Sequence, residues 1–173
     1  MTLEFSRIEE QIVRQLPEIL PAANNYWKQE GRPGDDCGAY IFFEGMFATY
    51  VIILLHLPPS KERNRLLIRV YELLDLMLTS NDNNVHDLGY IGLLEGREAW
   101  FLRQSEPFLG IAAQKELDTW RSGWRTEILN SNLSPADEII DLYDVRSIIA
   151  KELTCDLSII PGRAYIPCKE NAT

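Results

Sequence analysis

The sequence predicts an all-α protein, an antiparallel array of helix pairs packed around one central apolar helix. Apolar residues recur at helical spacing in successive segments, and short stretches with proline or glycine separate these segments. No part of the chain alternates apolar and polar residues between hairpin turns, as a sheet would require. With 173 residues, of which 46% are hydrophobic, the chain has the size and composition of a single globular domain, residues 1–173.

The first two helices are predicted from their apolar faces and from a proline between them. Apolar side chains recur every three or four positions from Leu3 to Leu16, and charged side chains take the opposite face. Pro17 then marks a boundary. A second helix over about 18–30 ends at the turn sequence GRPGDDCG.

The central helix is predicted over about 36–57, before Pro58 and Pro59. It contains CGAYIFFEGMFATYVIILL, in which Glu44 is the only charged residue, so the segment approaches the length and apolarity of a membrane span. A carboxylate in the middle of such a segment is unfavourable in lipid. We therefore expect a buried core helix and no membrane association.

Capping residues define the next pair of helices. Ser60 is placed to cap a helix that ends near Thr79. An aspartate or asparagine then caps a helix over about 83–104, and the glycines of that helix permit close packing against its neighbours.

Two tryptophans lie in the helix that follows the break at Pro107 and Gly110. Trp120 and Trp124 are one helical turn apart, and each is followed by an arginine. This spacing fits a stripe of core residues. It also fits an interface anchor, since tryptophan and arginine are enriched at binding hot spots.

The last helix is predicted to begin at Ser134, with proline at the first helical position and an acid two residues later, and to reach about Leu153. Residues 154–173 are predicted to form an irregular or extended tail. Within it, 157–160 and 164–166 are the best candidates for strands.

The charge balance favours a protein partner over nucleic acid. The chain has 26 acidic and 17 basic residues, a formal charge of −9, which disfavours contact with phosphates or anionic membranes and suits a basic partner. Acidity that only keeps the protein soluble explains the same numbers. The strongest acidic pattern is predicted to form one face of the last helix, either as a docking surface for a cationic protein or as a solvated face; its members are Asp137, Glu138, Asp141 and Asp144.

The sequence has no common motif for a catalytic nucleophile, a metal-bound base or a cofactor loop, since none of GxGxxG, GxxxxGK[ST], HExxH or GxSxG occurs. His56 is expected to cap the end of the central helix, where an imidazolium complements the helix dipole. His86 would need Asp82, Asp87 or Glu95 as a co-ligand, in no known ligand order. The sequence therefore predicts a protein that is not an enzyme and has no cofactor.

Two glutamates interrupt apolar stretches. If Glu44 and Glu95 are buried, they need partners such as Arg69 or Arg97, because an unpaired buried carboxylate is strongly unfavourable. The alternative, a two-carboxylate metal site like that of ferritin-like proteins, lacks the Glu-x-x-His pairs of that class.

The three cysteines indicate a reducing compartment. They are an odd number, widely spaced and without a CxxC sequence, so neither a disulfide framework nor a zinc site is predicted. No signal peptide is predicted either, so we expect a cytoplasmic protein.

The stretch DNNVHDLGYIGLLEG resembles the second helix of a HEAT-type repeat, and RLLIRVYELLDLMLTS, which precedes it, would be the first. Glycines at 89, 92 and 96 replace the alanines usual in such repeats. The wider region, about 39–124 with EPFLGIAAQKELDTW, is similar to small bacterial all-helical proteins of polymorphic toxin systems, which include immunity proteins.

This resemblance implies an antidote that binds and blocks a co-encoded toxin, such as a contact-dependent growth-inhibition effector. Immunity proteins of this type often act against nucleases, and an acidic surface suits a basic nuclease. The alternative most similar to an immunity protein is a helical-repeat adaptor or regulator whose partner is not a toxin. A carboxylate metal-binding helical protein is the alternative from another class.

Overall fold

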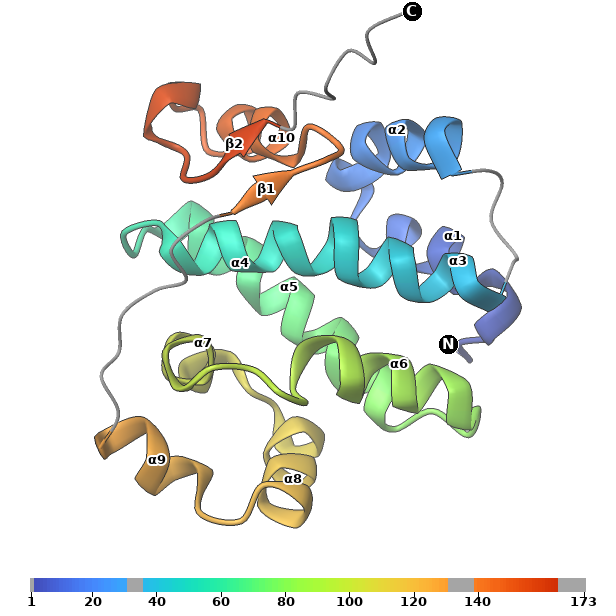
Figure 1. The fold of residues 1–173 in the computed structure, drawn as a ribbon, viewed down its shortest axis with the longest axis vertical. Helices are drawn as coiled ribbons and strands as arrows, with labels where there is room; N and C mark the ends of the chain where they lie inside the picture. Colours follow the sequence, from blue (N-terminus) through green and yellow to red (C-terminus); the bar gives the residue numbers. More distant parts are fainter. Residues whose placement is uncertain (1, 31–35, 131–138, 165–173) are drawn as a thin grey trace, which may run out of the picture.

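The computed structural model describes residues 2–30, 36–130 and 139–164, and it confirms an all-α fold. One long helix runs through the middle of the molecule, as predicted (Figure 1). It consists of α3 (Asp36–Ile41), the π-helical stretch η3 (Phe42–Phe47) and α4 (Ala48–His56). By length and composition the part from Gly38 to His56, with a mean hydropathy of 1.8, resembles a membrane span, but 67% of it is buried inside the protein. This burial favours the interpretation as a core helix.

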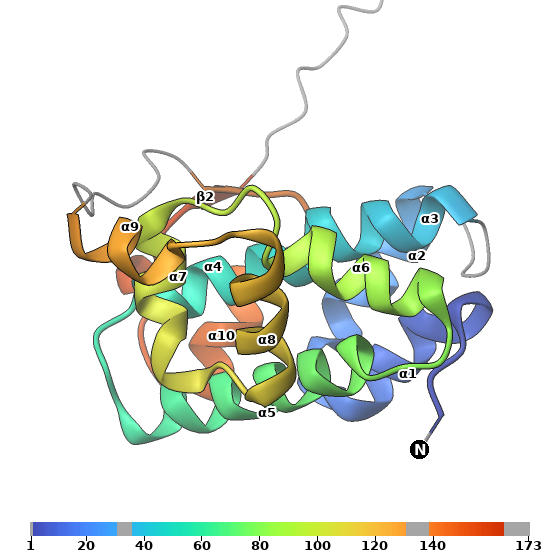
Figure 2. The same ribbon diagram turned by 90° about the horizontal axis from the view of Figure 1, so that it is seen from below.

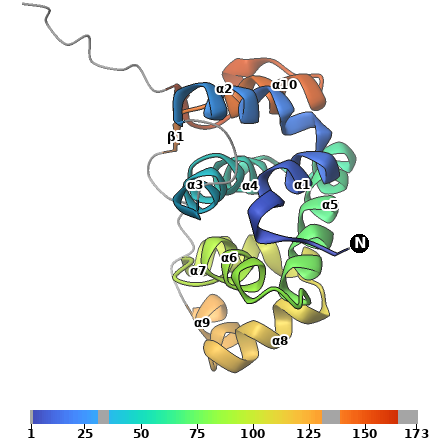
Figure 3. The ribbon, with the colours of Figure 1, turned by 90° about the vertical axis from the view of Figure 1, so that its right-hand side faces the viewer.

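The two ends of the described chain cover one side of the central helix. Figure 3 shows α2 and α10 together on that side, with α1 nearby. The helix α10 packs against α4, α2 and the turn η2. These elements are η1 (Phe5–Arg7), α1 (Ile8–Gln15), η2 (Pro17–Ile19), α2 (Leu20–Glu30) and α10 (Val145–Glu152). The predicted boundary at Pro17 is therefore confirmed.

The middle of the chain covers the opposite side (Figure 2). Its longest helix, α5, packs against α4, α6 and α8, while α7 contacts both α4 and α9. These elements are α5 (Lys61–Leu78), α6 (Asn83–Leu93), α7 (Ala99–Ser105), η4 (Glu106–Phe108), α8 (Ile111–Trp120) and α9 (Trp124–Asn130). The helices α5 and α6 form the predicted neighbouring pair, whereas their membership in a HEAT-like repeat stays a prediction.

The helices α5 and α6 both begin at side-chain caps that the sequence predicts. Ser60 Oγ accepts a hydrogen bond from the backbone N–H of Arg63 at 3.1 Å, and Asp82 Oδ1 accepts one from Asn84 at 3.0 Å. Each bond satisfies one of the backbone donors that a helix leaves free in its first turn.

Two glycines of α6 allow the close packing that the sequence predicts. A Cβ atom on Gly92 would collide with the ring of Phe43 in the central helix, and one on Gly89 would lie 3.0 Å from Cβ of Met77 in α5. The helix α6 can therefore approach two partners at once.

Two predicted helices are each broken into two by a turn. The helix expected over 83–104 ends at Leu93, and a turn at Gly96, with φ of +65°, leads into α7. The helix expected through both tryptophans ends at Trp120, and Gly123, with φ of +83°, precedes α9. Glycine adopts these left-handed conformations without the steric penalty of other residues.

The predicted last helix begins later than expected. It starts only at Val145, because residues before it form β1 (Ile140–Asp141), which pairs in parallel with β2 (Arg163–Ala164). The candidate strand 157–160 is wrong, since η5 (Leu157–Ile159) is a 3-10 turn. Of the candidate strand 164–166 only Ala164 is described, and it belongs to β2; the predicted start of the last helix at Ser134 lies outside the described residues.

The buried carboxyl of Glu9 gives a testable pH effect. Glu9 is only 2% exposed, and its Oε2 accepts a hydrogen bond from Trp27 Nε1 at 2.6 Å. Burial raises the pKa of Glu9, the Trp27 bond lowers it by less, and the charge of Glu10 raises it further. As the pH falls, the Glu9 carboxylate therefore binds a proton at a higher pH in the folded protein than in the unfolded chain.

We expect the stability of the wild type, relative to Glu9→Gln, to decrease as the pH rises from the ordinary pKa of a glutamate through the raised folded pKa of Glu9. The measurement is the free energy of unfolding by urea at about pH 4 and about pH 7. Glu72→Gln, at an exposed position on α5, is the control. An identical pH dependence of the wild type and Glu9→Gln would contradict the expectation.

Candidate functional site

The predicted acidic face is not present as such in the described residues. Asp137 and Glu138 lie outside them, and Asp141 is only 3% exposed. The Asp141 carboxylate accepts hydrogen bonds from the backbone N–H groups of Tyr143, Val145 and Arg146 at 3.3, 2.9 and 2.8 Å. Asp141 thus caps the start of α10, and its buried carboxylate is not available to a partner.

Asp144 is the one member of the predicted face that is both described and exposed. It has a left-handed backbone conformation, with φ of 62°, and accepts a hydrogen bond from Ser147 Oγ at 2.6 Å. The predicted placement of Asp141 and Asp144 on one helix face is wrong, because spacings of three and four residues place acids on one face only if the segment is helical, and 139–144 is not.

The two interrupting glutamates are both exposed, Glu44 on the central helix and Glu95 in the turn after α6. Neither needs a buried partner. Arg69 does not pair with either of them, since it forms an ion pair with Glu18. Arg97 donates to the carbonyl of Gly92. Burial lowers the pKa of Arg97, and the negative charge of Glu44 opposes this shift, so Glu44 acts on Arg97 through its charge.

His56 lies where the sequence places it, in the last turn of α4. Its Nδ1 is 2.8 Å from the Ile52 carbonyl oxygen, which requires the proton to be on Nδ1, and its ring lies 4.1 Å from the ring of Trp100. This packing fits the structural role predicted for His56.

A chain of polar contacts joins α6 to α8 on the surface. His86 Nδ1 lies 3.1 Å from Asp87 Oδ1, and His86 Nε2 lies 3.5 Å from Glu116 Oε1. The other Glu116 oxygen accepts a hydrogen bond from Trp120 Nε1 at 2.9 Å. His86 is therefore positioned by two carboxylates, Asp87 and Glu116. Asp82, another predicted partner, accepts the backbone N–H of His86 at its own backbone carbonyl, and its carboxylate instead accepts the N–H groups of Asn84 and Phe5. Glu95, the last predicted partner, lies in the turn after α6.

Trp120 is 69% exposed at the end of this chain of contacts. Tyr90, on α6, has a raised pKa because it is partly buried and because Glu95 and Glu116 place negative charge near its hydroxyl. We call the residues His86, Asp87, Tyr90, Glu116 and Trp120 the Trp120 surface. It combines an exposed aromatic side chain with several carboxylates.

The second tryptophan has the opposite environment. Trp124 is 1% exposed, its Nε1 donates to Asp118 Oδ1 at 2.8 Å, and the Arg125 guanidinium lies 4.4 Å from its ring centre. The structure therefore assigns Trp124 to the core and Trp120 to the surface. Sequence spacing alone gave both the same interpretation.

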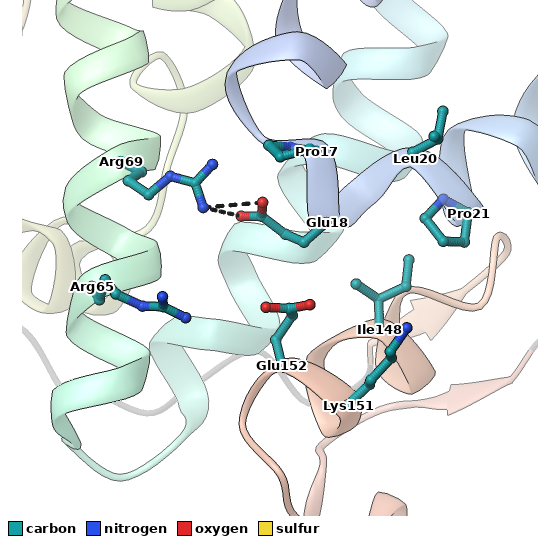
Figure 4. A pocket seen from close by; sticks show the side chains of 9 residues that line it. All are labelled: Pro17, Glu18, Leu20, Pro21, Arg65, Arg69, Ile148, Lys151 and Glu152. Atoms are coloured by element: carbon teal, nitrogen blue, oxygen red, sulfur yellow. Dashed lines mark hydrogen bonds and ion pairs between the residues drawn. The ribbon is translucent and has the colours of Figure 1, made fainter.

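A pocket of about 480 Å³ lies where η2 and α2, α5 and α10 meet (Figure 4). This volume is within the range of small-molecule sites. Five charged and four apolar residues line the pocket, namely Glu18, Arg65, Arg69, Lys151, Glu152, Pro17, Leu20, Pro21 and Ile148. This pocket was not predicted from the sequence, because its residues come from three distant segments.

An ion pair forms one wall of the pocket. Arg69 Nη1 lies 3.0 Å from both oxygens of Glu18, whose side chain is 4% exposed, and Arg69 Nη2 donates to the Gln15 carbonyl at 2.5 Å. Tyr50 also donates to Glu18, at 3.3 Å. Burial, with the negative charge of Glu18, raises the pKa of Tyr50 well above its ordinary value, so the phenol stays protonated.

No three side chains of the kinds that bind metals lie close together in the described part of the chain. Compared with known proteins, the chain matches no family model, no curated protein and no solved structure.

Proposed function

We propose that this protein is an immunity protein, a cytoplasmic non-enzymatic protein that binds and neutralises a cognate bacterial toxin with a basic surface. The Trp120 surface is the observation that carries the proposal. The resemblance of residues 39–124 to helical proteins of toxin systems supplies the class of partner.

Trp120 has the properties of a binding hot spot. A tryptophan that is 69% exposed leaves a large apolar area in contact with water. The hydrogen bond to Glu116 holds the indole in one orientation, so little side-chain freedom remains to be lost when a partner covers it. Tryptophan is among the residues that contribute most at protein interfaces.

The charges around Trp120 favour a basic partner. Asp87 and Glu116 lie in the same chain of contacts, and Glu95 is near Tyr90. The cation Arg121, next to Trp120, is already paired with Glu127 at 2.5 Å. A lysine or arginine of the partner can therefore approach carboxylates and also stack on the indole.

The proposal expects a toxin-like protein to be encoded beside this gene. We expect Trp120→Ala to weaken the complex with that protein by about thirtyfold or more, since loss of a hot-spot side chain costs about 2 kcal/mol. Purified wild type and variant are titrated against that protein, and protection is scored by co-expression. Ile159→Ala, which removes a side chain that is 63% exposed on η5, is the matched control and should leave affinity unchanged.

Two outcomes separate the parts of the proposal. If the wild type neither binds nor protects, the protein is not the immunity protein of that toxin. If it binds and protects, but Trp120→Ala is as effective as the control, the Trp120 surface is not the docking site.

A further inference from the structure

The pocket between η2, α5 and α10 contains three charged groups without partners. The side chains of Arg65, Lys151 and Glu152 make no hydrogen bond or ion pair within the described chain, although the charge of Glu152 acts on the buried hydroxyl of Tyr50. In contrast, Glu18 and Arg69 neutralise each other in the pocket wall. In Figure 4 the Arg65 guanidinium extends toward the Glu152 carboxylate, and Lys151 lies on the other side of Glu152.

The sign and number of these free charges restrict the ligand. A simple anion would meet Arg65 and Lys151 but would also lie against Glu152, which is half-buried. A simple cation would pair with Glu152 but would be repelled by both bases. A ligand with one positive and two negative groups complements all three side chains.

The remaining lining of the pocket fits a short aliphatic body. Leu20, Pro21 and Ile148 contribute apolar surface beside the charged groups. Concave sites that combine apolar walls with a few charged groups are typical of small-molecule binding.

We propose that this pocket binds a small zwitterion with one ammonium and two carboxylate groups, the charge pattern of an acidic amino acid. Glu152 binds the ammonium group, and Arg65 and Lys151 bind one carboxylate each. The Glu18–Arg69 pair fixes the wall against which the ligand lies. This site is separate from the Trp120 surface and does not depend on the toxin-binding proposal.

The test is titration calorimetry of the full chain at neutral pH with L-glutamate and three analogues that each lack one charge. Glutarate lacks the ammonium group, 4-aminobutyrate lacks the α-carboxylate, and L-glutamine lacks the side-chain charge. We expect L-glutamate to bind. Each analogue should bind at least about tenfold more weakly, because it lacks one hydrogen bond to a charged group.

Substitutions of the unpaired charged side chains then show which group of the ligand each side chain binds. Glu152→Gln should remove the preference for L-glutamate over glutarate, and Arg65→Gln should remove the preference over 4-aminobutyrate or L-glutamine. Lys115→Gln, at an exposed position on α8, is the control and should change neither preference. Unchanged thermal midpoints will show that the variants are folded.

Three results would overturn the proposal: no binding of L-glutamate at millimolar concentration, glutarate binding as tightly as L-glutamate, or the same preferences in both pocket variants as in the wild type. The second result would indicate a simple anion site. The third would place binding elsewhere on the protein.

Discussion

Trp124→Ala is expected to lower the free energy of unfolding by about 3–5 kcal/mol, the range for truncating a buried aromatic side chain to alanine. Trp124 is 1% exposed and lies at the start of α9, where the substitution would leave a cavity between α9 and α7. It would also leave Asp118 without the indole N–H that helps to keep its pKa below the ordinary value.

Urea denaturation followed by circular dichroism measures this effect, with Trp120→Ala as the matched control. Because Trp120 is 69% exposed, its loss should change stability by less than about 0.5 kcal/mol. Similar losses in both variants would contradict the assignment of one tryptophan to the core and the other to the surface.

Asp141→Ala is expected to cost about 3 kcal/mol, because it removes a helix cap and leaves several backbone N–H groups unsatisfied in a buried region. The Asp141 carboxylate accepts three such hydrogen bonds, at the junction between β1 and α10. The loss should be concentrated in α10 and the β1–β2 pair. Amide hydrogen exchange of Val145 and Arg146 will therefore increase with the drop in stability.

Asp144→Asn provides the contrast for this second experiment. Asp144 is exposed, and asparagine tolerates its left-handed conformation. We expect a change of less than about 0.5 kcal/mol. If instead Asp144→Asn were as destabilising as Asp141→Ala, the division between a buried and an exposed acid would be wrong.

Helices fixed by local information were predicted well from the sequence. The caps at Ser60 and Asp82 and the end of the central helix before Pro58 all depend on residues within one or two turns. The same holds for the close contacts of α6, since a glycine on an apolar face indicates close approach of a neighbour. The helix predicted over 3–16 is present but shorter, since the 3-10 turn η1 precedes α1, which begins only at Ile8.

Features that depend on distant segments were not predicted. Ile140 and Asp141 read as part of a helix, yet they pair with residues more than twenty positions later in the chain. The turn at Gly123 separates two tryptophans that have the same local pattern but opposite burial. The pocket is the extreme case, because neither its shape nor the partners of Glu18 and Arg69 are visible in any single stretch of sequence.

Two walls of the pocket come from opposite ends of the described chain, and this has a consequence for the synthesis of the protein. One wall comes from residues 17–21 and another from residues 148–152, so a nascent chain has no such pocket until α10 has left the ribosome. Any compound bound there would stabilise the finished fold over partly made or truncated chains, because it binds only the native state. Only a chain in which α10 has packed against the N-terminal segment could then bind a ligand at this pocket.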